Sequence, residues 1–250
     1  MSAVPGERGA RDERRPLPTI AVVLELARAA LVRTFRGRGL WVAAIIAMLP
    51  VGLALVIAYA AHERDERIWE KTYVICQLAL TVVPAILVGA AVSDEVEDKT
   101  SAYLWSRALA RWTVIAGKLL ALAPLCGLIL GAGAVAAYVI AGMSAVIPSE
   151  RMIDGVIGLF AAGVAASAIA AMIATLVPRH AVAVTIGWMF AVDLWLAEVD
   201  IPLRHLSTSF GARAIAGFIG NAGDASGAIT LLVIAVIATA IACWRVGKLE

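Results

Sequence analysis

Charged residues gather in one segment between two long apolar stretches, and this segment is the part of the chain best suited to bind a partner. Residues 93–118 have the sequence SDEVEDKTSAYLWSRALARWTVIAGK. The acids come first and the bases later, an order that complements a helix macrodipole. We therefore expect at least one helix here, with Ser93 or Asp94 as its N-cap. Tyr103 and Leu104, flanked by charge, would fit a groove on a soluble partner. A solvated loop with an amphipathic helix on the membrane surface is the alternative.

A second candidate is Asp193, which interrupts the apolar run FAVDLWLAEV. A carboxylate deep in a bilayer costs about 2.5–3.5 kcal/mol on insertion scales, so it faces protein or a wet path. Two roles fit this position. Asp193 could line a substrate path, or it could hold a neighbouring helix by a hydrogen bond.

Other kinds of chemistry find no support. The chain has neither H-E-x-x-H nor G-x-S-x-G, so no enzyme is predicted. Cys76, Cys126 and Cys243 lie inside apolar runs, where cysteine behaves as a small hydrophobe. The outward-facing soft ligands would suit copper, but their spacing supports no metal site; they are His62, Met143, Met152 and His205. A phosphate-binding G-x-x-x-x-G-K-[ST] loop is also missing, so this chain is not expected to bind or hydrolyse ATP.

The elements that would position these residues are membrane spans. The chain has 250 residues, of which 62% are hydrophobic and 16% charged, a composition typical of an integral membrane protein. A span needs about 20 apolar residues, and in lipid its backbone must satisfy itself, so an all-α fold is expected. Six segments qualify: 40–61, 73–92, 119–141, 153–177, 182–201 and 228–246.

The distribution of charge gives these spans an orientation. With six spans, 15 of the 21 Lys and Arg residues fall on the side of the two termini. The positive-inside rule then predicts a protein of the cytoplasmic (inner) membrane with both termini in the cytoplasm. Interfacial aromatic residues would follow the same division. Those expected at the inner interface are Trp41, Trp105, Trp112 and Trp244, and those at the outer interface are Trp69, Tyr73, Tyr138 and Trp195.

Shorter elements complete the expected single membrane domain, residues 18–250, which follows a disordered cytoplasmic arm at 1–17. Residues 19–36 predict an amphipathic interfacial helix that anchors the chain and could also act as an elbow against a partner. Residues 212–219 predict a short helix dipping into the outer leaflet. Glycines four apart, such as Gly127 and Gly131, would permit close helix packing, most simply within the chain.

The charged segment resembles the loop after the second span in ABC-2 type transporter permeases. That loop often has a Glu-rich lead, a Thr after a basic residue or Gly, "YLL", "RPVPRW" and "GK". The matching residues are Glu95, Glu97, Asp98, Thr100, Tyr103, Leu104, Arg107, Arg111, Trp112, Gly117 and Lys118. Ala108 and Ala110 depart from the pattern, because proline is common at those positions.

The resemblance implies a concrete function. In this family the loop forms a coupling helix that docks on an ATP-binding subunit, and that subunit holds ATP and Mg²⁺. Two permease chains pair around a substrate path, which would make this chain half of a homodimeric exporter. No nucleic acid is expected as a partner. The residues that would contact the ATPase subunit are Asp94, Glu95, Glu97, Asp98, Lys99, Thr100, Tyr103, Leu104, Arg107 and Arg111.

Two rival functions remain open from the sequence. The same fold could serve as a non-transporting membrane anchor or immunity-type protein that binds a partner. A membrane enzyme with no recognisable motif is the other rival.

Overall fold

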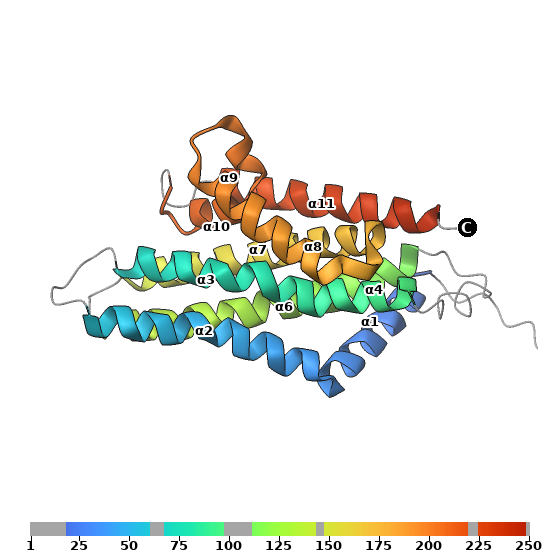
Figure 1. Cartoon of the computed structure of the whole chain (residues 1–250), viewed down its shortest axis with the longest axis horizontal. Coiled ribbons are helices and arrows are strands. Elements are labelled where there is room, and N and C mark those ends of the chain that lie inside the picture. The colour runs from blue at the N-terminus through green and yellow to red at the C-terminus, as the bar shows by residue number, and fades with distance from the viewer. Residues whose placement is uncertain (1–18, 61–67, 98–111, 144–147, 220–224, 249–250) are drawn as a thin grey trace, which may run out of the picture.

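Long helices run back and forth along one axis of the molecule (Figure 1). The structure, a computed structural model, describes residues 19–60, 68–97, 112–143, 148–219 and 225–248. These residues form helices and turns, and no strand occurs among them. The expected all-α fold is therefore confirmed over the described part of the chain.

The described helices follow one another in chain order. Their bounds are α1 Thr19–Arg36, α2 Arg38–Ala60, α3 Ile68–Pro84, the π-helical turn η1 Ala85–Gly89, α4 Ala90–Glu97, α6 Trp112–Ala141, α7 Ser149–Leu176, the 3₁₀ turn η2 Pro178–His180, α8 Ala181–Trp188, the π-helical turn η3 Met189–Asp193, α9 Leu194–Glu198, the 3₁₀ turn η4 Pro202–Leu206, α10 Thr208–Ile215 and α11 Ala225–Gly247.

Six of these helical stretches are long and apolar enough to cross a membrane, as the sequence predicted. They cover Arg38–Val56, Ile68–Val96, Trp112–Ala141, Ser149–Leu176, Pro178–Glu198 and Ala225–Gly247. All six begin earlier than predicted, and the difference is largest for the second and third, which begin at Ile68 and Trp112. Hydropathy finds the lipid-crossing core of a helix but not the turns that extend beyond it, because those turns contain polar residues.

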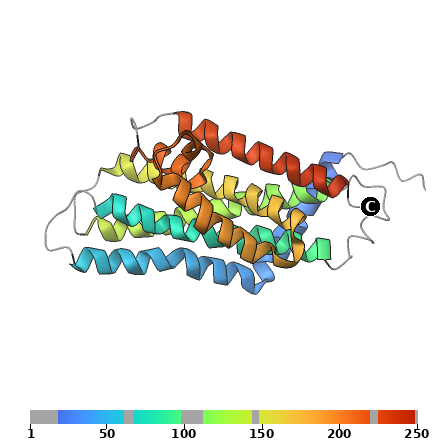
Figure 2. The same cartoon turned by 45° about the horizontal axis from the view of Figure 1, so that its top comes forward.

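Three spans form the centre of the bundle and three lie around it. In the spans that contain α3, α6 and α7, more than half of the residues are buried, whereas α2 and α11 bury only 22% of theirs. The views in Figures 1 and 2 agree that α2 and α11 lie on opposite sides. Lipid or another protein must therefore cover the outer helices.

Small residues allow the central helices α6 and α7 to pack closely, as the glycine spacing suggested. A Cβ added at Gly163 would lie 3.1 Å from the Cα of Gly127, and one added at Gly127 would lie 2.7 Å from the ring of Phe160. The glycines therefore serve contacts within this chain.

The predicted N-terminal helix is present with the predicted bounds, as α1. It crosses the bundle obliquely and turns sharply into α2 at Gly37 (Figure 1). Its inner face packs against α6, with Val22 and Ala27 buried. We call the end of the bundle where α1, α4 and the end of α11 lie the α1 end, and the opposite end, with α9, η4 and α10, the α10 end.

The short helix between the last two spans differs from the prediction. It covers Thr208–Ile215 instead of 212–219, and seven of its eight residues are buried in the protein. Gly217 ends it in a left-handed conformation with φ 72°, where the Gly217 and Phe218 amides donate to the carbonyls of Ala214 and Arg213. The sequence did not predict the start of the helix because its first residues, Thr208 and Ser209, are polar. Both bind the carboxylate of Asp193, a contact that hydropathy cannot identify.

Candidate functional site

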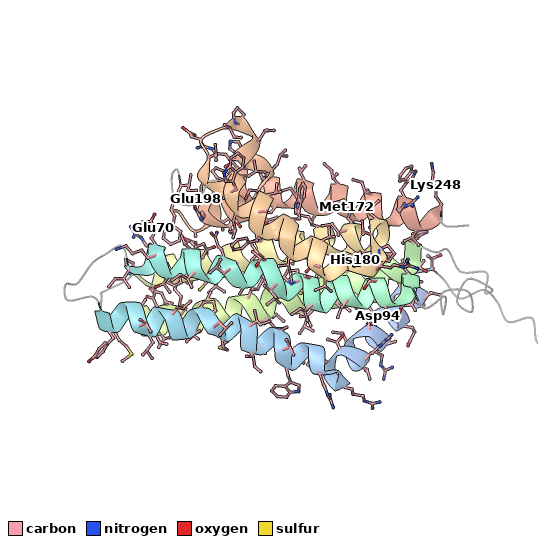
Figure 3. The ribbon with its side chains drawn as sticks, viewed as in Figure 1. Glu70, Asp94, Met172, His180, Glu198 and Lys248 are labelled. Carbon is pink, nitrogen blue, oxygen red and sulfur yellow. The ribbon has the colours of Figure 1, made fainter. Side chains whose placement is uncertain are left out.

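The acidic start of the charged segment lies at the α1 end, at the end of α4 (Figure 3). Asp94 is exposed and Glu95 partly exposed, and Glu97 is the last residue of the helix. The predicted N-cap at Ser93 or Asp94 is wrong, because α4 continues from the second span through η1 and both residues lie inside it. The Ser93 hydroxyl instead donates to the carbonyl of Ala90 at 3.1 Å.

Most of the predicted contact set falls between α4 and α6. Asp98, Lys99, Thr100, Tyr103, Leu104, Arg107 and Arg111 lie outside the described residues. The two flanks of the segment, α4 and the start of α6, are described, and they carry the rest of the geometry.

Lys118 joins these two flanks. Its side chain comes from α6 and is 8% exposed, and its Nζ lies 2.9 Å from the Oε1 of Glu95 on α4. The same ammonium donates to the backbone carbonyl of Ala91. An ammonium this far from water needs such partners, since an unpaired buried charge is costly. The Lys118–Glu95 pair therefore fixes how α4 sits against α6.

The helix α1 packs against the same place. The guanidinium of Arg33 lies 3.9 Å from the carboxylate of Asp94, and both side chains are more than half exposed. Closer in, a Cβ added at Gly117 would lie 2.9 Å from the Cβ of Leu26 and 3.0 Å from the carbonyl oxygen of Val23. The absence of a side chain at Gly117 thus lets α6 touch the backbone of α1.

At the α10 end, Asp193 makes hydrogen bonds of the kind that the second of its two predicted roles requires. It is 3% exposed, at the end of the π-helical turn η3. One carboxylate oxygen accepts from the Thr208 amide at 2.7 Å, and the other accepts from the Ser209 amide at 3.1 Å. The hydroxyls of both residues also donate to Asp193, at 3.1 and 2.7 Å. The carboxylate therefore binds the N-terminus of α10, where anions are favoured.

The Ser207 hydroxyl completes this attachment. It donates to the backbone carbonyl of Asp193 at 2.9 Å and accepts from the Phe210 amide at 3.0 Å, as an N-cap does. The fifth span and α10 are thus joined through both the side chain and the backbone of Asp193.

Sequence reasoning missed a buried arginine on α10. The Nε of Arg213 donates to the Gln77 side chain on α3 at 2.8 Å. The Nη2 of Arg213 lies 2.6 Å from the Glu198 carboxylate. Gln77 in turn donates to the carbonyl of Ser209 at 2.9 Å. These partners are 132 and 136 residues apart in the chain, so no local pattern could pair them. A Gln inside a predicted span was the one signal that a polar partner was needed.

Aromatic residues expected at the outer interface are partly internal. Trp69 and Tyr73 are at most 1% exposed, and they stack edge-on with each other and pack against Phe218. The Tyr73 hydroxyl donates to the carbonyl of Ala212 at 3.1 Å. These rings are buried because Phe218 and the α7 backbone at Gly155 lie against both of them, and Tyr138 of α6 also lies against Trp69. Trp195, by contrast, is 58% exposed, consistent with an interfacial position.

No group of three His, Cys, Asp or Glu side chains that could hold a metal ion occurs among the described residues. His205, one of the soft ligands considered, packs edge-on against the ring of Phe210.

Comparison with family models and with curated proteins identifies no relative of this chain. No family model matches the chain, and no curated protein matches it. The function must therefore be argued from the residues and their positions.

Proposed function

We propose that this protein is the permease half of an ABC exporter, which moves a substrate using ATP hydrolysed by a separate subunit. The observation that carries the proposal is the setting of the charged segment. Residues 93–118 begin on α4 and end on α6, they resemble the coupling loop of ABC-2 type permeases, and Glu95 and Lys118 join their two flanks at 2.9 Å.

The contacts of the flanks supply a mechanism. A partner that pulls on residues 98–111 acts on α4 and α6 together, because the ion pair between them is largely buried and hard to separate. The contact between Gly117 and α1 extends the same movement to α1. Through α4 it reaches α3, and through α6 it reaches the centre of the bundle. Closure of an ATPase dimer would thus move the core spans.

The charge distribution supports a cytoplasmic position for the α1 end. The positive-inside rule places residues 98–111 and both termini on that side, where ATP is available. A second copy of this chain would complete the substrate path, with the sparsely buried outer spans available to contact it.

The test is reversal of the charges of Glu97 and Asp98. The variant with both residues changed to Arg should no longer co-purify with the ATP-binding subunit, and the ATP hydrolysis of the assembled complex should be lost. The reason is that two residues expected to contact the partner then carry the opposite charge. Glu150→Arg is the matched control, since Glu150 is an exposed acid at the start of α7, at the other end of the bundle. It should leave both readouts unchanged.

Undiminished co-purification and ATP hydrolysis in the Glu97 and Asp98 variant would contradict the docking role. Co-purification of a partner that hydrolyses no ATP would support a membrane anchor or immunity-type protein instead.

A further inference from the structure

A cavity of about 360 Å³ opens at the α1 end between α1, the start of α2, the end of the second span and α6. Its volume falls in the range of ligand sites. We propose that it binds one phospholipid with an ethanolamine head group, with an acyl chain inside the cavity and the head group at its mouth. This inference goes beyond the proposed transport function and does not depend on it.

Apolar side chains form much of the cavity wall. Leu26 of α1, Leu40 of α2, Ile86 of η1 and Leu122 of α6 line it. An acyl chain that lies against these side chains gains free energy by leaving water. Lipid is also close at hand, because the neighbouring Trp41 side chain on α2 is 70% exposed on a span that buries little of its surface.

The charged lining has two parts with different accessibility. Deep in the site, Lys118 and Glu95 satisfy each other at 2.9 Å. At the mouth, Arg33 and Asp94 lie 3.9 Å apart with side chains 70% and 56% exposed. An exposed pair at this distance contributes little, so its members can exchange partners readily. The mouth thus presents one cation and one anion to a ligand.

A zwitterionic head group matches that arrangement. The guanidinium of Arg33 can bind the phosphate through two N–H groups. The carboxylate of Asp94 can accept hydrogen bonds from a primary ammonium, which carries three N–H donors. A choline head group has no N–H to donate. A glycerol head group can donate its hydroxyls to Asp94 but carries no positive charge to pair with the carboxylate. Ethanolamine is therefore the head group that the site should select.

The experiment uses the purified, delipidated full chain in detergent, incubated with dioleoyl phosphatidylethanolamine, phosphatidylcholine or phosphatidylglycerol. Native mass spectrometry counts the lipids retained. We expect about 10-fold tighter retention of the ethanolamine lipid, the effect of one charge-assisted hydrogen-bonding site. Asp94→Asn should reduce that preference to about 2-fold or less, because an amide no longer pairs with the ammonium charge. Glu25→Gln should not, since Glu25 is an exposed acid on α1 outside this cavity.

A second pair of variants tests the acyl-chain part. Gly39 lines the cavity, and a Cβ added there meets only Ile86, at 4.0 Å, so the first atom of a Leu side chain at this position fits without a clash. It should lower retention of the ethanolamine lipid at least about 10-fold. Gly52→Leu on the same helix is the control, because a Cβ at Gly52 meets nothing within 4 Å and Gly52 does not line the cavity.

Three results would overturn the proposal. These are equal retention of the three lipids by the unaltered protein, preference for phosphatidylglycerol, and unchanged retention in Gly39→Leu with folding confirmed by its thermal unfolding midpoint.

Discussion

At the residue scale, the Asp193 carboxylate accepts four hydrogen bonds from the start of α10. Its two oxygens accept from two different backbone amides, Thr208 to one and Ser209 to the other. Asn has the same shape but only one acceptor oxygen. In Asp193→Asn one of these amides must therefore face an NH₂ group and lose its partner.

We expect Asp193→Asn to cost about 1–3 kcal/mol, the penalty of one buried amide left unsatisfied. Hydrogen exchange should accelerate in α10, above all at Thr208 and Ser209, and the thermal unfolding midpoint should fall. Asp200→Asn is the matched control, since the Asp200 carboxylate is 90% exposed and pairs only at the surface with Arg204. Unchanged exchange in α10 would show that Asp193 does not hold this helix. It would favour the other predicted role of Asp193, as a residue of the substrate path.

Gly158 gives a second prediction at this scale. A Cβ there would lie 2.6 Å from the Ala212 carbonyl oxygen and 2.7 Å from the Tyr73 hydroxyl. Gly158→Ala should therefore separate α7 from α10 and cost about 1–3 kcal/mol, the usual range for overpacking. Thermal unfolding in detergent measures this cost. Gly187→Ala is its control, because a Cβ at Gly187 meets nothing within 4 Å; equal midpoints for the two variants would contradict the packing described here.

At the scale of elements, the ion pair between α4 and α6 predicts that removing either partner alone has a different cost in the free energy of unfolding. Glu95→Gln leaves the ammonium of Lys118, 8% exposed, without its counter-charge, whereas Lys118→Met leaves a Glu95 side chain that is still 22% exposed. The first change should cost about 2 kcal/mol, somewhat below the fully buried range because Glu95 reaches water, and the second should cost less.

Combining the two changes should recover most of the loss, because no charge is then left unpaired. The unfolding free energies of both single variants and the double variant make the comparison. Additive losses would show that Glu95 and Lys118 do not interact.

The elements that the sequence predicted well are those encoded locally. Hydropathy located the six spans, and the charge pattern of α1 gave its bounds, since both signals repeat along one helix. The α10 attachment was not predictable in the same way. Arg213, Gln77 and Glu198 meet only after four spans have packed, so neither periodicity nor spacing connects them.

Part of the candidate site was also beyond sequence reasoning. The sequence shows that the acids of residues 94–97 follow a span directly, but the helix that carries them continues from the span instead of beginning at Ser93 or Asp94. A change from apolar to charged residues looks like a helix boundary, although a helix continues wherever its backbone hydrogen bonds do.

At the scale of the whole molecule, the proposal requires a definite orientation. With Cys243 replaced by Ser, and with Cys76 and Cys126 buried, a single added cysteine reports which side it occupies. Thr100→Cys should resist a membrane-impermeant thiol reagent in intact cells and react after permeabilisation. Ser149→Cys, at the exposed start of α7, should react in intact cells. The reverse pattern would place residues 98–111 away from ATP.

The most direct test of the central claim is native mass spectrometry of the complex extracted from its own membrane in mild detergent. We predict two copies of this 26.1 kDa chain together with two copies of a subunit that carries a phosphate-binding loop and hydrolyses ATP. A stable assembly that contains this chain but no ATP-hydrolysing subunit would contradict the claim.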